Sequence, residues 1–578
     1  MTPASARAPS VPAVIFVLLA ILVPLGLQQP MLNADGDPAR HLTHGLYMIA
    51  HRSLIHHDPF SFTRPGAPFL GFEYGSQLAY ALAYRVGGLP AVAILAGLLI
   101  ATAYAMLAAF LLRRGVDPLL AYATTACAAA LGAGHWVARP HLFSLVAVVV
   151  LLGILERPTR IPLWIIGAMF AVWANFHGGF VFGWILIGAY VAGTAGEWLL
   201  NRQSSTGERV RYLTFALAIA VFATVLNPHG PALLEHVTEF LGKRFIQNNT
   251  QEFLSPNFHE IDGRIFLCGI ALLVLTLAMV RERPTLPRLC AILVTLAFGL
   301  MSVRNVSLFG MIALPLLALH ADAAWRALPD PRSLRTNFGA MASRASTWPF
   351  VLPAALAIAL LALAHGRVGG HAVMAQDFDP ATFPVAAVEK ARAEKVQGRM
   401  FNEFAWGGYL IFAWPEQRIF IDGGTDFFGE DLFEEYSKVK LLQPGWRDVL
   451  DRWNISLAML RRRSALAHEL VRNPEWSPLY CDSLTALLRR QPGATPYSAT
   501  QGDSAEHALD GCAGPSGARG DADQGYAPRK PDAAERTGLE PEDAGEGPVE
   551  PVRYVADIGA DGRASEPPRK SGDDDAGK

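Results

Sequence analysis

Two aspartates separated by one residue form the sharpest chemical feature of the sequence, in the run NADGDPARH at residues 33–41. Carboxylates at this spacing can share a divalent cation such as Mg²⁺ or Mn²⁺, with Asp35 and Asp37 as the ligands. Alternatively, one carboxylate acts as a base while the other orients a basic partner. Gly36 is expected to let the loop turn tightly. A solvated turn after a helix would have the same pattern, so all three interpretations stay open.

A third carboxylate, Glu73, follows in the same segment and precedes residues 74–84, which are predicted to form a helix at the membrane interface. Glu73 is either an anion at the start of that helix or a second acidic group facing the first pair. Residues 56–58 read His-His-Asp. We interpret this run as a structural turn, because neighbouring side chains diverge and are poorly placed to share a metal.

Several short turns between apolar segments carry histidine, asparagine or arginine: His135, Arg139 with His141, Asn175 with His177, Asn227 with His229, and Arg304 with Asn305. Ionisable residues near a membrane core are unfavourable unless they face the protein interior, an ion or a substrate. Each one alone could be a packing histidine or an arginine that reaches the interface. Together they favour a site, and Arg139 and Arg304 are candidates for binding an anion such as phosphate.

The composition indicates what must position these residues. The chain has 578 residues, 51% of them hydrophobic and only 17% charged, with a mean hydropathy of +0.25. A soluble domain has about 25% charged residues. The values exclude a cytosolic globular protein, a nucleic-acid binder and a disulfide-stapled secreted module. They predict a polytopic membrane protein whose first partner is the lipid bilayer.

Eleven segments are apolar enough over about 20 residues to span the bilayer as helices. They are centred near Leu18, Gly97, Cys127, Val148, Phe170, Ile187, Ile219, Leu272, Val294, Ala313 and Ile358. The first could instead be a secretory signal, because Arg7 precedes a short apolar run. We favour an uncleaved helix, since no small-residue cleavage site precedes Gln28.

Arginines predict the orientation, because Lys and Arg are retained on the cytoplasmic side. They gather in alternate connections: Arg113, Arg114, Arg157, Arg160, Arg202, Arg209, Arg211, Arg281, Arg283, Arg288, Arg326, Arg332, Arg335 and Arg344, with Arg7 before the first helix. The opposite short connections hold only Arg139 and Arg304. The N-terminus is therefore predicted to be cytoplasmic and the C-terminal part extracytoplasmic. The loops at about residues 30–90 and 227–264 then share the outer face with the polar turns.

Three regions are predicted: a membrane domain over residues 1–368, a small α/β extracytoplasmic domain over 369–490 and a disordered acidic tail over 491–578. In the second, strands are expected at 399–401, 418–421 and 455–460, and helices at 403–414, 432–442, 446–453 and 465–472. The tail has too few large apolar residues to offset the entropy of ordering. A disulfide between Cys481 and Cys512 is one alternative for these cysteines.

These residues together resemble the membrane glycosyltransferases of the GT-C class: Asp35, Asp37 and His41, the run DPFSF at 58–62, Glu73, ARPH at 138–141 and WANFHGG at 173–179. Two C-terminal runs, NEFAWGGYL at 402–410 and IDGGTD at 421–426, are similar to a little-characterised bacterial branch. The likeness covers about residues 18–490. An arginine would be expected where Gly424 stands, which weakens any role of the 422–426 loop.

The resemblance implies a transferase that moves a hexosyl or pentosyl group from a polyprenyl-phosphate donor to a glycan, lipid or protein acceptor outside the bacterial inner membrane. By it, Asp35 or Asp37 is the base or metal ligand, with Glu73 as a further catalytic carboxylate. The predicted substrate-binding residues are His41, Arg139, His141, Asn175, His177 and Arg304. Two rivals remain: a transporter or flippase for a lipid-linked or anionic solute, and a non-catalytic envelope assembly protein.

Overall fold

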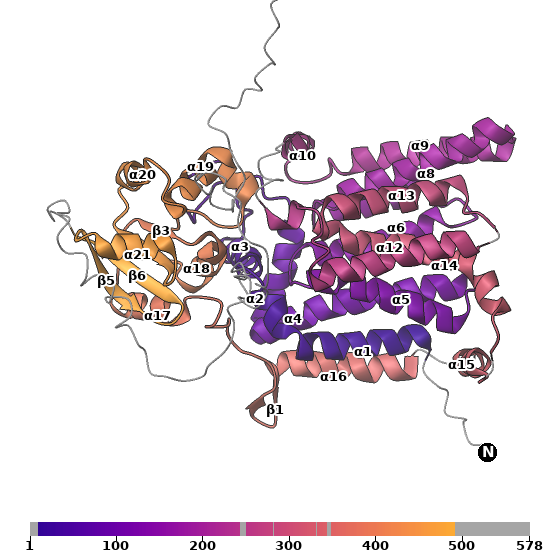
Figure 1. The fold of residues 1–578 in the computed structure, drawn as a ribbon, viewed down its shortest axis with the longest axis horizontal. Helices are drawn as coiled ribbons and strands as arrows, with labels where there is room; N and C mark the ends of the chain where they lie inside the picture. The colour runs from indigo at the N-terminus through magenta and orange to yellow at the C-terminus, as the bar shows by residue number, and fades with distance from the viewer. Residues whose placement is uncertain (1–9, 243–249, 281, 331, 344–347, 492–578) are drawn as a thin grey trace, which may run out of the picture.

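The computed structural model describes residues 10–242, 250–280, 282–330, 332–343 and 348–491. A bundle of long apolar helices forms its first part, and a small mixed sheet with its own helices lies at one end of that bundle (Figure 1). The predicted tail from residue 492 onward, with Cys512, lies outside the described residues, as do Arg7, Arg281 and Arg344.

Each predicted spanning segment is helical. The helices are α1 (Val11–Gly26), α4 (Tyr74–Arg113), α5 (Pro118–Gly132), α6 (His141–Leu155), α7 (Leu163–Ala174), α8 (Phe180–Asn201), α9 (Ser204–Ala223), α12 (Ile261–Met279), α13 (Leu286–Met301), α14 (Val306–Ala327) and α16 (Trp348–Leu363). Within the described ranges, four stretches are both long and apolar enough to cross a membrane: α4, α8, α12 and Val303–Ala327. The chain is a polytopic membrane protein, whereas eleven crossings and their orientation stay predictions.

Small residues of the helices are buried at close contacts, and some large apolar side chains are exposed, as in helices that face lipid. Ala96 and Ala103 on α4 are fully buried, whereas Phe222 on α9 and Leu275 on α12 are 75% and 56% exposed. Lipid tails are as apolar as leucine, so close backbone approach through small residues holds such helices together.

Two short helices lead from α1 to α4: α2 (Gln28–Asn33) and α3 (Asp37–His51). The backbone of α4 is non-helical at Gly87 and Gly88, and Gly88 has φ of 65°. Only glycine adopts that conformation at little cost. The break separates the predicted interface helix at 74–84 from the spanning part of α4.

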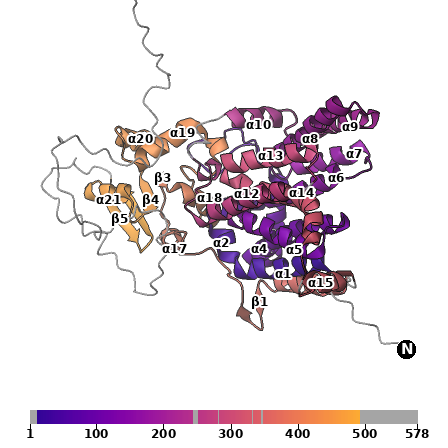
Figure 2. The ribbon, with the colours of Figure 1, turned by 45° about the vertical axis from the view of Figure 1, so that its right-hand side comes forward.

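The other connections carry short helices. At the end facing the sheet these are η1 (Ala133–His135), α10 (Ala232–Gly242), η2 (Gln251–Phe253) and η3 (Val303–Asn305), and α15 (Leu334–Ser343) lies at the opposite end (Figures 1 and 2). The polar turns of the sequence are therefore at the end of the bundle that faces the sheet.

After α16 comes a hairpin of β1 (Arg367–Val368) and β2 (His371–Ala372), followed by the C-terminal α/β segment. Its elements are α17 (Val385–Ala393), β3 (Met400–Asn402), η4 (Phe404–Trp406), α18 (Gly407–Ala413), α19 (Thr425–Lys440), α20 (Trp446–Arg452), β4 (Leu457–Arg461), α21 (Ala465–Arg472), β5 (Trp476–Cys481) and β6 (Thr485–Arg490). The strand order is β3-β4-β6-β5, with β3 parallel to β4 and the other pairs antiparallel.

The predicted strand at 418–421 is wrong. Instead of joining the sheet, Ile419 forms an isolated bridge with Ser61 of the first outer loop. The Ile419 amide donates to the Phe60 carbonyl and the Phe62 amide donates to the Ile419 carbonyl, both at 3.1 Å. The DPFSF run thus satisfies backbone groups that the sequence pattern assigned to the sheet.

Glycines let the first outer loop and α18 touch backbone to backbone. A Cβ atom on Gly408 would lie 2.1 Å from the carbonyl oxygen of Gly36, and one on Gly36 would lie 2.7 Å from that of Ala405. Gly36 itself has ordinary φ and ψ of −76° and −10°. It is therefore needed for this close approach, not for the tight turn that we expected.

Candidate functional site

The turn that carries Asp35 and Asp37 is folded around Arg139. One terminal guanidinium nitrogen of Arg139 pairs with Asp35 and lies 3.5 Å from Asp37 Oδ2, and the other pairs with Glu252 of η2. Asp35 also accepts a hydrogen bond of 2.9 Å from the Asp37 amide. Arg139 thus joins three carboxylates, two of which the sequence singled out together with it.

Arg40, one turn into α3, holds the other side of Asp37. Its Nε lies 3.2 Å from Asp37 Oδ1. Burial alone would lower the pKa of Arg40, but the surrounding carboxylates, with Asp37 foremost, raise it. Arg40 lies in the same NADGDPARH run at residues 33–41, yet it was not among the predicted site residues. Its place three residues after Asp37 on a helix was the available signal.

Glu73 lies between two histidines from different helices. One carboxylate oxygen is 3.7 Å from His41 Nδ1, and the other is 3.8 Å from His177 Nε2. Burial raises the pKa of Glu73 to about 8, although the positive charge of Arg40 opposes this. Burial also lowers the pKa of both histidines well below the usual value. All three groups are therefore largely uncharged at neutral pH.

Hydrogen bonds select the tautomer of His177. Trp173 Nε1 donates to Ser144 Oγ, which lies 2.7 Å from His177 Nδ1, and the Gly179 amide donates to the same Nδ1 at 3.0 Å. Because Nδ1 is an acceptor, the ring proton is on Nε2, which faces Glu73. The WANFHGG run thus positions a histidine that can donate to the carboxylate.

Two other predicted site residues, His141 and Asn175, form side-chain hydrogen bonds to backbone carbonyl groups. His141 Nε2 lies 2.7 Å from the His135 carbonyl oxygen. The Asn175 amide nitrogen donates to the carbonyls of Ala171 and Leu226, at 2.5 and 3.0 Å. Their geometry supports the turns at the helix ends, and neither side chain is directed at Glu73.

Arg304 differs from Arg139 in having no carboxylate within ion-pair distance among the described residues. Its guanidinium carbon lies 4.8 Å from the centre of the Phe253 ring. Its charge is close enough to lower the pKa of Glu252 and of Glu73, against the effect of burial on both. Arg304 is therefore a cation of this face whose charge no ion-pair partner neutralises within the described part of the chain.

The C-terminal α/β segment adds two aspartates that sequence reasoning had set aside. A Cβ atom on Gly423 would lie 2.3 Å from Asp37 Oδ1, so the loop that carries Asp422 rests on the Asp37 side chain. Asp422 is buried, which raises its pKa to about 6, and it accepts a 2.7 Å hydrogen bond from the Gly424 amide. A Cβ atom on Gly424 would lie 3.5 Å from Arg40 Nη1.

Asp426, at the start of α19, connects the C-terminal α/β segment to α10 through His236. His236 Nε2 lies 3.5 Å from Asp426 Oδ2. Burial would raise the pKa of Asp426, but the hydrogen bond to His236 and the charge of Arg40 bring it below its usual value. Neither residue could be placed from the sequence, because α10 and α19 are almost 200 residues apart along the chain.

The carboxylates of Asp35 and Asp37 do not have the arrangement of metal ligands. Each faces a guanidinium, and among the described residues no group of three or more His, Cys, Asp or Glu side chains could hold a metal ion. A divalent cation would have to displace Arg139 or Arg40. The donor set does not fit Mg²⁺ or Mn²⁺ as it stands, and no step below involves one.

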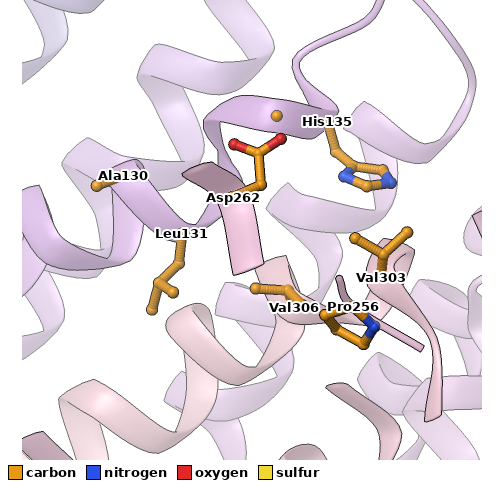
Figure 3. A pocket seen from close by; sticks show the side chains of 8 residues that line it. Ala130, Leu131, His135, Pro256, Asp262, Val303 and Val306 are labelled. Carbon is orange, nitrogen blue, oxygen red and sulfur yellow. The ribbon is translucent and has the colours of Figure 1, made fainter. Parts of the chain in front are cut away.

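A small pocket adjoins this cluster at the ends of α5 and α14. Figure 3 shows the Asp262 carboxylate and the His135 ring on one side of it, with apolar side chains around the rest. Its volume is about 20 Å³, which suits a water molecule. Sites for small-molecule ligands are usually about 300–1,000 Å³, so this pocket does not hold a sugar.

No protein-family model matches the chain, and no curated protein matches it. Among solved structures it is similar to the oligosaccharyltransferase of Archaeoglobus fulgidus in the apo form, at 12% identity over 84% of this chain and 74% of that one, with a TM-score of 0.49. It is also similar to AglB from the same organism, an oligosaccharyltransferase in complex with an inhibitory peptide and a dolichol-phosphate, at 13% identity over 78% and 68% of the two chains and a TM-score of 0.48. ArnT from Cupriavidus metallidurans in the apo state has 16% identity over 82% and 97%, with a TM-score of 0.47. Such low values say nothing about the chemistry of the site.

Proposed function

We propose that the protein is a membrane glycosyltransferase that moves a sugar from a polyprenyl-phosphate donor to an envelope acceptor on the outer face of the bacterial inner membrane. One observation carries the proposal. Glu73 is an acidic group whose side chain is 20% exposed, and it lies between two uncharged histidines, with no guanidinium within ion-pair distance in the described part of the chain. A carboxylate with this environment is suited to accept and hold a proton near the working pH.

The transfer step is a displacement at the anomeric carbon of the donor sugar. The acceptor hydroxyl oxygen forms the new bond, the bond from that carbon to the phosphate oxygen breaks, and its electron pair leaves with the phosphate. The hydroxyl proton goes to Glu73 in its ionised form, which is the minor form at neutral pH because burial raises the pKa of Glu73 to about 8. His177, whose Nε2 proton faces Glu73, stabilises the charged form of the carboxylate before the transfer.

The leaving phosphate needs a cation that is not already neutralised. Arg139 and Arg304 were equal candidates from the sequence. Arg139 is shared among Asp35, Asp37 and Glu252, whereas Arg304 contacts only the Phe253 ring among the described partners. We therefore assign the donor phosphate to Arg304, and to Arg139 the role of holding the acidic turn in place.

The experiment is transfer of label from a panel of polyprenyl-phosphate sugars, with candidate acceptors, in proteoliposomes. Wild type is compared with Glu73→Gln, Asp35→Asn and Asp37→Asn, each with and without EDTA. Glu235→Gln is the matched control, because Glu235 is exposed on α10 and makes the same chemical change outside the cluster. We expect transfer by wild type and the control, and loss in Glu73→Gln.

Two results would favour the rivals. Movement of a lipid-linked or anionic solute across the bilayer without transfer would support a transporter or flippase. Absence of both activities, with partner binding that is lost when residues 491–578 are deleted, would support an assembly protein.

Full activity of a folded Glu73→Gln variant would reject Glu73 as the proton acceptor. A loss of activity with EDTA would restore the metal hypothesis for Asp35 and Asp37.

A further inference from the structure

A second polar pocket lies at the opposite end of the helix bundle. The last residues of α6 and α8 meet the first residues of α9 and α13 there, far from the sheet (Figures 1 and 2). The pocket has a volume of about 340 Å³, and its polar lining includes Arg157, Tyr190, Ser205, Thr206, Arg209 and Arg288. This volume is in the range of sites that hold small ligands or lipid headgroups.

The deepest charge in this pocket is already neutralised. Glu156 accepts hydrogen bonds from Arg288, at 2.7 Å from Nη2, and from the Tyr190 hydroxyl, also at 2.7 Å. Arg114 lies 3.6 Å from the same carboxylate. The second carboxylate of the lining, Glu197, accepts a 2.9 Å hydrogen bond from the Leu286 amide at the start of α13.

Two arginines of the lining are left without a carboxylate partner. Within the described ranges, neither Arg157 nor Arg209 forms an ion pair. Arg209 donates only to the Leu155 carbonyl, at 2.5 Å, and stacks over Tyr212 at 5.7 Å, and Arg157 is exposed at the pocket mouth. The lining therefore has an excess of positive charge, which favours an anion with several acceptor oxygens.

The start of α9 adds neutral donors to these charges. No side chain caps this helix at Gln203, and Ser205 and Thr206 of its first turn line the pocket. A helix N-terminus carries a partial positive charge. Alone it would not make a site, but here it adjoins the two unpaired arginines.

Exposed apolar side chains on the helices α8 and α9, which line the pocket, indicate the source of the anion. Leu199 and Leu200, at the end of α8, are 55% and 76% exposed, and Phe215 on α9 is 62% exposed. Such residues contact acyl chains when helices cross a bilayer. Basic pockets between spanning helices are typical sites for the headgroups of anionic lipids, and this end is the one that the arginine distribution predicts to be cytoplasmic.

We propose that the pocket between α6, α8, α9 and α13 binds the phosphate group of an anionic phospholipid, with Arg157 and Arg209 as its charged ligands and the start of α9 as a further donor. The site is separate from the outer cluster. It does not depend on whether the protein is a glycosyltransferase.

The test is direct binding of dioctanoyl phosphatidylglycerol to the purified full-length protein in detergent, measured by calorimetry. Dioctanoyl phosphatidylcholine and inorganic phosphate are the comparison ligands. Two variants test the site in different ways. The double variant Arg157→Gln/Arg209→Gln removes the positive charge, and Ser205→Trp fills the pocket from an exposed position. Arg113→Gln is the matched control, since Arg113 is an exposed arginine at the same end that does not line the pocket.

We expect phosphatidylglycerol to bind wild type and the control equally, and to lose about tenfold or more in affinity in both site variants, as removing charge-assisted hydrogen bonds would predict. Phosphatidylcholine should bind much more weakly. Equal binding of phosphatidylglycerol to wild type and to folded Ser205→Trp would overturn the proposal, and so would equal binding of the two lipids. If inorganic phosphate binds as tightly as phosphatidylglycerol, the proposal of a lipid ligand is wrong, and the pocket binds a free anion instead.

Discussion

Each end of the helix bundle holds a glutamate, buried at Glu156 and partly buried at Glu73, and the partners of the two carboxylates are opposite in kind. Glu156, at the end of α6, is held by the Arg288 guanidinium through both oxygens and by the Tyr190 hydroxyl. Glu73, before α4, faces the rings of His41 and His177 at 3.7 and 3.8 Å. A guanidinium keeps a carboxylate charged and fixed, whereas neutral rings leave it free to take up a proton. The neighbours, not the residue type, decide between a structural and a chemical role.

The largest expected effect of this difference is on transfer. Glu73→Gln keeps the size of the side chain and removes the proton acceptor, so we expect activity to fall by about 10²–10⁴-fold. The measurement is initial rate of label transfer in proteoliposomes. Glu235→Gln should retain full rate, and a Glu73→Gln rate within twofold of wild type would erase the distinction between the two glutamates.

Glu156→Gln should lower the stability of the protein rather than act on the transfer step. It leaves the Arg288 guanidinium without its charged partner, which is expected to lower the free energy of unfolding by about 3–5 kcal/mol if the site is as desolvated as its burial indicates. Denaturant unfolding in detergent measures this. Glu73→Gln is the internal control, because it removes no guanidinium partner. Equal stability of the two variants would contradict the comparison.

Arg304→Gln should lower transfer by about 10–10²-fold without a comparable loss of stability, since a charge-assisted hydrogen bond is worth about 1.5–3 kcal/mol. Arg139→Gln should instead reduce stability as well as activity, because it removes the ion-pair partner of Asp35 and Glu252 and one of the two guanidinium partners of Asp37. Rates and unfolding midpoints measured on both variants separate the two roles. Equal effects on both quantities would refute the assignment of the phosphate to Arg304.

A further effect is on the pH dependence of stability. The pKa of Glu73 is raised to about 8 in the folded protein, from 4.5 for the free side chain. Between these values the folded state holds a proton that the unfolded state releases, so this group's contribution to stability is present below pH 4.5 and is lost as pH rises through 8. The unfolding temperature of Glu73→Gln relative to wild type should therefore increase from pH 5 to pH 8.5. A constant difference would show that Glu73 is ionised throughout.

The membrane part was predictable because its signal is local. All eleven apolar segments are helices, since a segment in lipid must satisfy its own backbone groups whatever its neighbours are. The strand at 418–421 was mispredicted for the opposite reason. A short run with three apolar residues, such as 419–421, can pair with any free backbone, and here the backbone of Phe60 and Phe62 provided it.

Asp35, Asp37, Glu73, Arg139 and His177 were identifiable from residue type and from their place in turns at one end of the predicted helices. What they do for one another was not. Arg139 could have been a phosphate ligand, and it proved to be shared among three carboxylates. Asp422 and Asp426 were missed because their importance depends on Arg40, almost 400 residues earlier in the chain. Arg40 was missed although its spacing from Asp37 was a local signal.

By itself, the sequence determined the helices, the end of the bundle that carries the polar turns and most of the acidic and basic residues found there. Those properties follow from hydrophobicity and charge along the chain. Only the tertiary structure decided which carboxylate has a guanidinium partner, which histidine nitrogen carries the proton and which arginine is left without a carboxylate. Charge, burial and proton affinity depend on distances of a few ångströms between residues from different helices, and no spacing in the sequence specifies those distances.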